Sequence, residues 1–347
     1  MEKTACPVVT PYEEACRARR PGAPPQSDRL KVDRSTDMSE YILNLLPLHE
    51  GEREEFESIA PGAVHVYAGR STVTPEQLAA ATVIFGWPRP EAMGAAVNLK
   101  WFQTMWAGAD DYAGKLPEGV LFTSSSGSNS RSVAEHMLTC LLSLCRCLPA
   151  YRDSQRARRW KDEGPMKTIL GAWVLVVGAG HIGSEFGRLC QALGAHTTGL
   201  KRRVSGPVEG FDRVGTMDEL DALLPRADVV ALVVPHSPET AGLMGADRIA
   251  LMKDDAILLS AGRGSVLDQA ALAEAMGTGK LWGAALDVTT PEPLPAGSPL
   301  WELPNLLLTP HVAGGMRLEI TRRRCVEMAQ ENLRRYLAGE ELENIIE

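Results

Sequence analysis

The 347-residue sequence contains no apolar run long enough for a membrane helix and no long block of basic residues. Its apolar runs, such as Trp173 to Val177 and Val229 to Val234, have the length of strands, whereas a membrane helix needs roughly 20 apolar residues. The 36 lysines and arginines are outnumbered by 44 aspartates and glutamates, for a formal net charge of -8. We therefore expect a soluble protein with neither a membrane nor a nucleic acid as its main partner.

The sequence also lacks the cysteine pattern of a disulfide framework, because its seven cysteines are an odd number. Cys140, Cys145 and Cys147 lie in one predicted helical pattern, and Cys190 lies in another. Residues two apart on a helix cannot share a face, so Cys145 and Cys147 favour buried apolar side chains over metal ligands. Reduced thiols predict a cytoplasmic protein, and we expect no metal site.

Residues 1–38 have no continuous apolar stretch and so lack the central feature of a secretory signal. They contain a Pro- and Arg-rich run between Arg19 and Pro25, together with scattered charges of both signs. This composition predicts a flexible N-terminal extension.

The length of the chain predicts two domains, with ample apolar material for their cores. From Tyr41 onward, strand-length apolar runs alternate with helical patterns, which is typical of a parallel sheet. The strands predicted in this first series are Tyr41–Leu46, Val64–Tyr67, Thr82–Gly86 and Leu99–Thr104, and a helix is predicted over Pro75–Ala81.

A long helix is predicted to begin near Ser132 and to form the junction between the two domains. Ser132 and Glu135 match a capping box, and apolar residues recur after Ser132 at helical spacing. A final helix is predicted to end at Gly339, because apolar residues recur every three or four positions before it, at Val326, Ala329, Leu333 and Tyr336.

A glycine-rich motif follows the predicted strand Trp173–Val177 and precedes a helical pattern. It has the spacing GxGxxG and comprises Gly178, Gly180, His181, Ile182 and Gly183. In such loops the first glycine allows a tight turn, the second lets the backbone approach a pyrophosphate, and the third lets helix and strand pack closely. The helix N-terminus then receives the phosphate charge. We favour nucleotide binding over an ordinary glycine-rich turn, and we interpret the His181 side chain as a packing or exposed turn residue.

The end of the next predicted strand carries the residues that select the cofactor. A carboxylate about 20 residues beyond the glycines binds the ribose 2'-hydroxyl of NAD. This chain instead has Lys201, Arg202 and Arg203, and it has no Asp or Glu between His196 and Arg203. The cations suit a 2'-phosphate, which predicts NADP(H) as the preferred cofactor. NAD remains possible, and a solvated basic turn is the alternative interpretation.

Three polar residues in the last third of the chain suggest a catalytic site. Arg263, Glu292 and His311 each follow a short apolar run, so they could meet at the strand ends of one sheet. Arginine offers forked donors to an anion, and histidine titrates near neutrality. A glutamate beside the histidine would hold one ring tautomer and favour the imidazolium form, which can donate a proton to a developing alkoxide.

From Tyr41 to Glu347 the chain resembles the D-isomer-specific 2-hydroxyacid dehydrogenase family, which includes glyoxylate/hydroxypyruvate reductases and phosphoglycerate dehydrogenases. The resemblance rests on several motifs in the family's order, which makes it more specific than the glycine motif alone. These motifs are Gly178 to Gly183, Ala227 to Val230, Pro235 to Thr240, Ser260 to Gly264, Gly283 to Val288, Pro291 to Pro293 and Thr309 to His311.

The resemblance implies an α/β fold of two Rossmann-like, doubly wound parallel-sheet domains with the active site in the cleft between them. The substrate domain would comprise 39–131 plus 316–347, and the dinucleotide-binding domain would comprise 132–315. The resemblance further implies a homodimer formed through the cofactor domain.

The resemblance also implies roles for single residues. Arg263 would grip the carboxylate and carbonyl oxygen of the substrate, His311 would be the general acid/base, and Glu292 would be its partner. Asp287 would hold the nicotinamide carboxamide, with a strand-end cap as the alternative. Further cofactor contacts are implied for Pro235, Thr240, Ala261 and Gly314, and substrate contacts for Gly86, Trp87, Pro88 and Gly108. Trp87 and Trp106 could each be a wall of the substrate site or part of the core.

The activity implied is reduction of a 2-oxo acid to a D-2-hydroxy acid by hydride transfer from NADPH. A dinucleotide-sensing corepressor on the same scaffold is the alternative from another class, although Lys201 and Arg202 favour a reductase. A formate dehydrogenase fits less well, because Glu292 stands where that branch carries an amide.

Overall fold

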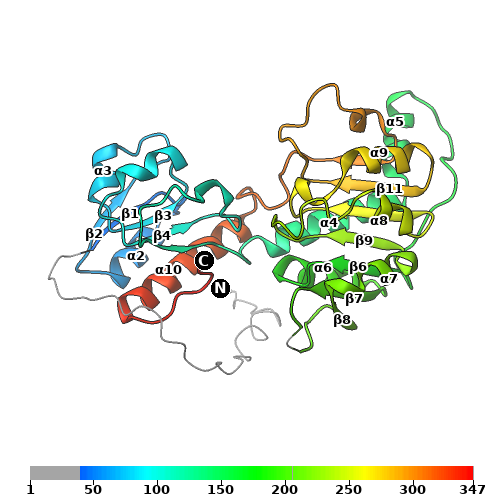
Figure 1. Ribbon diagram of the computed structural model, residues 1–347. Helices are drawn as coiled ribbons and strands as arrows, with labels where there is room; N and C mark the ends of the chain where they lie inside the picture. Colours follow the sequence, from blue (N-terminus) through cyan, green and yellow to red (C-terminus); the bar gives the residue numbers. More distant parts are fainter. Residues whose placement is uncertain (1–39, 205, 347) are drawn as a thin grey trace, which may run out of the picture. The chain divides into compact units, whose positions relative to one another are not determined.

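The strands of the protein are divided between two parallel sheets (Figure 1). The computed structural model describes residues 40–204 and 206–346, so the predicted extension over 1–38 lies outside the described residues. The described residues belong to one compact unit. Two doubly wound parallel-sheet layers confirm the predicted fold class, whereas the predicted domain boundaries and cleft remain predictions.

The first sheet has five strands in the order β2-β1-β3-β4-β5. Their bounds are β1 (Tyr41–Asn44), β2 (Val64–Tyr67), β3 (Val83–Gly86), β4 (Trp101–Thr104) and β5 (Leu121–Thr123). The four predicted strands are confirmed, although β1 ends two residues earlier, β3 begins one residue later and β4 begins two residues later than predicted. Strand β1 ends at Asn44 because the Oδ1 of that residue accepts a hydrogen bond from the backbone N–H of Leu46 (2.9 Å), which turns the chain.

Helices from distant parts of the chain accompany this sheet. Their bounds are α2 (Glu52–Ile59), α3 (Pro75–Ala80), η1 (Pro90–Ala95), η2 (Asp110–Tyr112) and α10 (Glu319–Ala338). The apolar face of α10, including Val326 and Leu333, packs against Phe85 and Trp101 of the sheet. The helix ends at Gly339, whose φ of 74° is the left-handed conformation of a C-cap. The predicted final helix and its end are therefore confirmed, and the chain does return to the first sheet.

The second sheet has seven strands in the order β12-β11-β10-β9-β6-β7-β8. Their bounds are β6 (Trp173–Val177), β7 (His196–Lys201), β8 (Arg213–Thr216), β9 (Val229–Leu232), β10 (Ala256–Ser260), β11 (Leu281–Leu286) and β12 (Leu306–Leu308). The associated helices are α4 (Ser130–Cys145), α5 (Leu148–Arg156), α6 (His181–Ala192), η3 (Met217–Glu219), α7 (Leu220–Leu223), η4 (Leu224–Arg226), α8 (Ala246–Leu251), η5 (Gly264–Val266), α9 (Gln269–Gly277) and η6 (Pro299–Glu302).

Alternate residues of these strands face two separate apolar clusters. Leu175 and Val177 of β6 join the cluster that contains Leu272 of α9. Val174 and Val176 join the other cluster, together with residues of α4 and Phe186 of α6. Because successive side chains of a strand point to opposite faces, both faces of the sheet are covered by helices.

The start of α4 differs from the prediction. The helix begins at Ser130 after Asn129, and no side chain caps it. Ser132 lies inside the first turn and donates its hydroxyl to the carbonyl of Ala313 (2.5 Å), so the predicted capping box at Ser132 is wrong. The Ser132 hydroxyl makes this contact with a residue 181 positions away, and the local sequence spacing does not indicate it.

The cysteines are free thiols among the described residues, as predicted. Burial raises the pKa of the Cys190 thiol to about 12 and that of Cys140 to about 11, with a smaller contribution at Cys140 from Asp287. The expectation of one helix for Cys145 and Cys147 is wrong, because α4 ends at Cys145 and Cys147 precedes α5 with a left-handed φ of 53°.

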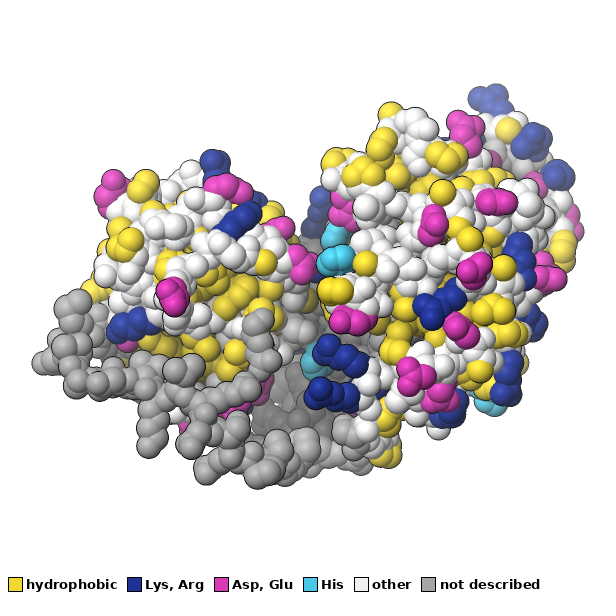
Figure 2. Space-filling model, viewed as in Figure 1, with side chains coloured by type: hydrophobic (Ala, Val, Ile, Leu, Met, Phe, Trp, Pro, Cys, Tyr) yellow, Lys and Arg dark blue, Asp and Glu magenta, His cyan; other side chains and the backbone are white. Residues whose placement is uncertain are grey.

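Over the described residues, no single helix has the length and apolar composition to cross a membrane, and α4 and α5 meet that test only jointly, across a bend of 68°. On the face drawn in Figure 2, acidic and basic side chains are interspersed.

Candidate active site

The carboxyl ends of parallel strands bring most of the predicted site residues to one edge of the second sheet. In the sheet register, Ser260 of β10 lies opposite Leu286 of β11, and Leu286 lies opposite Leu308 of β12. The loops that follow these three strands carry Arg263, Asp287 with Glu292, and His311. The glycine motif follows β6 at the same edge, because β6 is parallel to β9 and β9 is parallel to β10.

The glycine loop has the shape that a pyrophosphate requires. Gly178 has a φ of +116°, and a Cβ on Gly183 would lie 2.1 Å from the carbonyl oxygen of Gly178. Gly180 precedes α6, which no side chain caps, and a Cβ on Gly180 would meet no atom within 4 Å. The loop therefore fits a dinucleotide, with one glycine for packing and another facing open space. His181 is exposed, as one of its two interpretations predicted.

The three predicted cations lie at the carboxyl end of β7, beside this loop. The last residue of β7 is Lys201, and exposed Arg202 and Arg203 follow it. The backbone N–H groups of Gly178 and Ala179 both donate to the carbonyl of Leu200, which joins the two loops at their first residues. This position suits a group that extends from the ribose of a bound dinucleotide.

Glu292 and His311 are in direct contact. His311 Nδ1 lies 2.9 Å from Glu292 Oε2, and the other carboxylate oxygen of Glu292 accepts the backbone N–H of Thr289 (3.0 Å). With the carboxylate as acceptor, Nδ1 carries a proton, and Nε2 is the ring nitrogen left to face a substrate. The two side chains are 49% and 39% exposed, so the pair is open to a ligand.

Arg263 is held by a carboxylate that the sequence did not single out. Its Nε donates to Asp110 Oδ2 (3.0 Å), and its Nη1 donates to the carbonyl of Gly262 (2.9 Å). The backbone of Gly108 also lies against the guanidinium of Arg263, since a Cβ on Gly108 would be 2.0 Å from Arg263 Nη2. The only available signal was that Asp110 follows the predicted substrate residue Gly108 in the loop after β4.

Asp287 is buried, with 5% exposure, and contacts the loop after β12. Its Oδ1 accepts hydrogen bonds from the Thr309 hydroxyl (2.6 Å) and the backbone N–H of Val312 (2.9 Å), and its Oδ2 accepts from the backbone N–H of Ala313 (3.0 Å). The structure thus shows the strand-end cap that was the alternative for Asp287, whereas its contact with a carboxamide remains a prediction. Sequence reasoning missed Thr309 as a polar partner.

The predicted substrate loop follows β3 and is fixed by aromatic contacts. Trp87 packs against both apolar clusters of the first sheet, meets the Trp106 ring edge-on at 5.3 Å, and lies 3.5 Å from the Arg70 guanidinium. The carbonyl of Pro88 accepts a hydrogen bond from the Tyr112 hydroxyl (2.7 Å). Both tryptophans are therefore part of the core's edge, and a wall function for either remains a prediction.

The remaining predicted cofactor residues lie in loops at the carboxyl edge of the second sheet. The Thr240 hydroxyl donates to the carbonyl of Pro235 (2.7 Å) and closes the loop after β9. Ala261 follows β10, and Gly314 lies against Asn129, whose Nδ2 would be 2.5 Å from a Cβ on the glycine. Direct contact of these residues with a cofactor remains a prediction.

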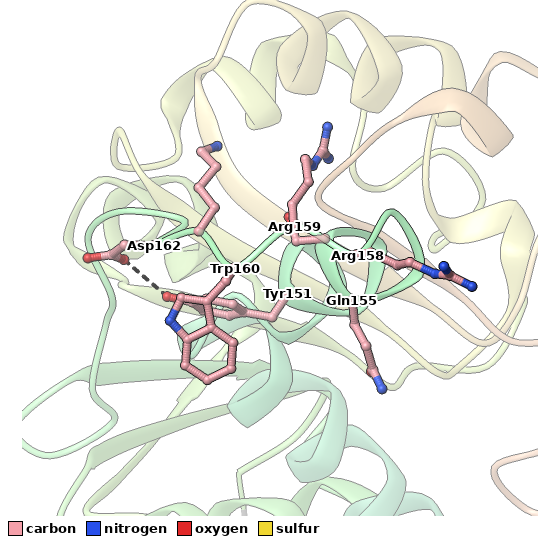
Figure 3. A pocket seen from close by; sticks show the side chains of 8 residues that line it. Tyr151, Gln155, Arg158, Arg159, Trp160 and Asp162 are labelled. Atoms are coloured by element: carbon pink, nitrogen blue, oxygen red, sulfur yellow. Dashed lines mark hydrogen bonds between the residues drawn. The ribbon is translucent and has the colours of Figure 1, made fainter.

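One hollow among the described residues is lined by Tyr151, Gln155 and Trp160 and by none of the predicted site residues. It measures about 600 Å³ and lies beside α5 (Figure 3). Tyr151 donates its hydroxyl to Asp162 across it (3.1 Å), and Trp160 is fully exposed there. A second cavity of about 10 Å³ is lined by His136, Cys140 and Asp287, among other residues. Its volume is close to that of a single water.

The fold and this edge define an α/β protein with a glycine loop of the dinucleotide-binding type, a His311–Glu292 pair and an arginine at the strand ends. Residues 138–313 match the family model described as D-isomer specific 2-hydroxyacid dehydrogenase, NAD binding domain. That match covers half of the chain, and the protein belongs to this family.

Relatives and solved structures agree with this assignment. The chain is 37% identical to D-3-phosphoglycerate dehydrogenase of Mycobacterium tuberculosis over 72% of this chain and 47% of that protein, so it spans about half the length of this curated relative. A family protein from Aeromonas salmonicida superimposes with a TM-score of 0.77 at 29% identity, covering 89% of this chain and 99% of that one. An NADPH-dependent glyoxylate/hydroxypyruvate reductase from Sinorhizobium meliloti, solved with NADP and sulfate, gives 0.73 at 25% identity, covering 89% and 98%.

Two glycines of one loop should fail in different ways when replaced by alanine. Gly183→Ala places its methyl 2.1 Å from the Gly178 carbonyl oxygen, so we expect a loss of about 1–3 kcal/mol in the free energy of unfolding. Gly180→Ala meets no atom and should leave stability within about 0.5 kcal/mol, but it should weaken NADPH binding because the methyl blocks the approach of the pyrophosphate. Thermal unfolding and fluorescence titration measure the two effects. An equal loss of unfolding free energy in both variants would contradict this account. An affinity of Gly180→Ala for NADPH equal to that of the wild type would also contradict it.

Proposed function

We propose that the protein reduces a 2-oxo acid to the corresponding D-2-hydroxy acid, with NADPH as the preferred hydride donor. The observation that carries the proposal is the 2.9 Å contact between His311 and Glu292 at the same sheet edge as Arg263 and the glycine loop. An acid/base pair, an anion-binding cation and a dinucleotide loop are the parts that carbonyl reduction of a carboxylate substrate requires.

The chain's own residues orient the substrate and move one proton. Glu292 accepts a hydrogen bond from the Nδ1–H of His311, which stabilises the imidazolium and leaves its Nε2–H to face the carbonyl oxygen. Arg263 binds the substrate carboxylate with the guanidinium protons that Asp110 and Gly262 do not use. When bound, the reduced nicotinamide supplies the hydride to C2. As C2 becomes tetrahedral, the oxygen takes the proton from Nε2 of His311, and the product is the hydroxy acid.

Arg263→Lys should strongly reduce activity although it keeps the charge. A lysine ammonium cannot hold Asp110 and a planar carboxylate with fixed forked donors, so we expect kcat/KM for the oxo acid to fall on the order of 100-fold. The assay follows NADPH absorbance with glyoxylate, hydroxypyruvate and bulkier 2-oxo acids. Arg248→Lys, whose arginine pairs with Asp221 on α7, is the matched control. Unchanged kinetics of Arg263→Lys would refute the assignment of Arg263. Failure of the wild type with every acid would favour a dinucleotide-sensing binding protein.

The NADPH preference is proposed from Lys201 and Arg202 at the end of β7, and NADP in the Sinorhizobium meliloti structure supports it. Lys201→Ala/Arg202→Ala should raise the KM for NADPH at least about tenfold, because each charge-assisted contact to a phosphate contributes about 1.5–3 kcal/mol. The KM for NADH should stay within about twofold. Arg323→Ala, at an exposed position of α10, is the control. Equal losses with both cofactors would exclude a 2'-phosphate site at these residues.

We further propose a homodimer formed through the segment between α4 and β6. Exposed apolar side chains gather in this segment, with Trp160 fully exposed, Leu170 70% exposed and Leu148 53% exposed. Light scattering should give twice the chain mass of 37.5 kDa. Trp160→Glu/Leu170→Glu should give the monomer, whereas Val97→Glu, at an exposed apolar residue beside the first sheet, should not. A wild-type monomer at micromolar concentration would rule out this proposal.

A further inference from the structure

The loop that carries His311 is fastened to one buried residue. In addition to its three side-chain hydrogen bonds, Asp287 accepts the backbone N–H of His311 with its own carbonyl (2.8 Å). Hydrogen bonds from Thr309, His311, Val312 and Ala313 therefore all converge on Asp287. A buried carboxylate needs such donors, because an unpaired charge in this position is strongly disfavoured.

His311 needs this support because its backbone is strained. Its φ is +52°, in the left-handed region that residues with a side chain rarely adopt. In this conformation the ring Nδ1 lies against Glu292, so relaxation of the backbone would carry the imidazole away from its partner. The aim of the ring thus depends on the contacts of its loop.

A second layer of polar groups holds Thr309 in place. His136 of α4 lies with its Nε2 3.1 Å from the Thr309 hydroxyl oxygen and 3.9 Å from Asp287 Oδ1. The Thr309 hydroxyl donates to Asp287 Oδ1, so its oxygen is free to accept a hydrogen bond from His136. His136, Thr309 and Asp287 form a chain of hydrogen bonds that runs from α4 to the catalytic loop.

We propose that Thr309 and His136 are positioning residues that act through Asp287 to hold His311 against Glu292. This inference rests on the proposed function, because it explains how the ring of the proposed acid/base residue, His311, is oriented. It is separate from any contact between Asp287 and a carboxamide, since Oδ2 has one donor and retains a lone pair for another. We call the hydrogen bonds from His136 to Thr309 and from Thr309 to Asp287 the clamp. A substitution at Thr309 weakens the clamp while both carboxylate oxygens of Asp287 are kept.

Thr309→Val removes the hydroxyl while nearly keeping the volume of the side chain. We expect kcat to fall about tenfold, with KM for the oxo acid and for NADPH within about twofold, because binding is kept and only proton transfer is misaligned. Thr309→Ser should restore kcat to within about threefold of the wild type. Thr139→Val, whose hydroxyl donates only to the Glu135 carbonyl on α4, is the matched control and should have no effect.

Hydrogen exchange provides a readout that is independent of activity. The amides of Val312 and Ala313 donate to Asp287, so Thr309→Val should speed their exchange about tenfold while the amides of α6 stay unchanged. His136→Leu should give the same pattern and serves if Thr309→Val does not fold. An inactive wild type would sink the proposed function and leave the exchange test intact. The proposal would be overturned if Thr309→Val left either the exchange of these amides or kcat unchanged. It would also be overturned if the KM for NADPH rose by the same factor as kcat fell.

Discussion

The parallel register of the second sheet is the constraint on which the site depends. Because β10, β11 and β12 are parallel neighbours, their carboxyl ends lie at one edge, and the three loops that follow them begin side by side. The turn into α6 follows β6 at the same edge. A strand slip of one residue would move every buried side chain to the opposite face, so the two apolar clusters fix the register. Hydrophobic burial thereby decides at which edge Arg263 and His311 lie.

Within that edge, His311 and Arg263 each have a carboxylate partner within the protein. His311 faces Glu292, and Arg263 faces Asp110. These pairs are partly exposed to solvent, so each contributes little to stability, roughly 0–1 kcal/mol. Their value is orientational, because a pre-aimed guanidinium or imidazole loses less side-chain freedom when a substrate binds. Under the proposed function, a substrate carboxylate would share Arg263 with Asp110, which would disfavour substrates that carry further negative charge close to it.

The sequence predicted the elements that depend on local pattern, and it missed those that depend on tertiary contact. Strand-length apolar runs, the glycine spacing and the position of Gly339 are local signals, and the strands, loop and final helix follow them. The Arg263–Asp110 contact joins residues 153 positions apart, and no spacing rule indicates it. Ser132 shows the same limit from the other side. Its local pattern matched a helix cap, but in the structure the Ser132 hydroxyl donates a hydrogen bond to the Ala313 carbonyl instead.

The strained backbone of His311 and the burial of Asp287 have one common explanation. A left-handed residue other than glycine costs of order 1–3 kcal/mol, and the protein must offset that cost elsewhere. Releasing the loop would remove the donors from a buried carboxylate, and each lost bond to a charged group costs about 1.5–3 kcal/mol. With three such donors on Asp287, release costs more than the strain it would relieve. An apolar residue at position 287 would remove that penalty, and the loop could then relax. A buried charge here selects one loop conformation, and that conformation aims the imidazole at Glu292.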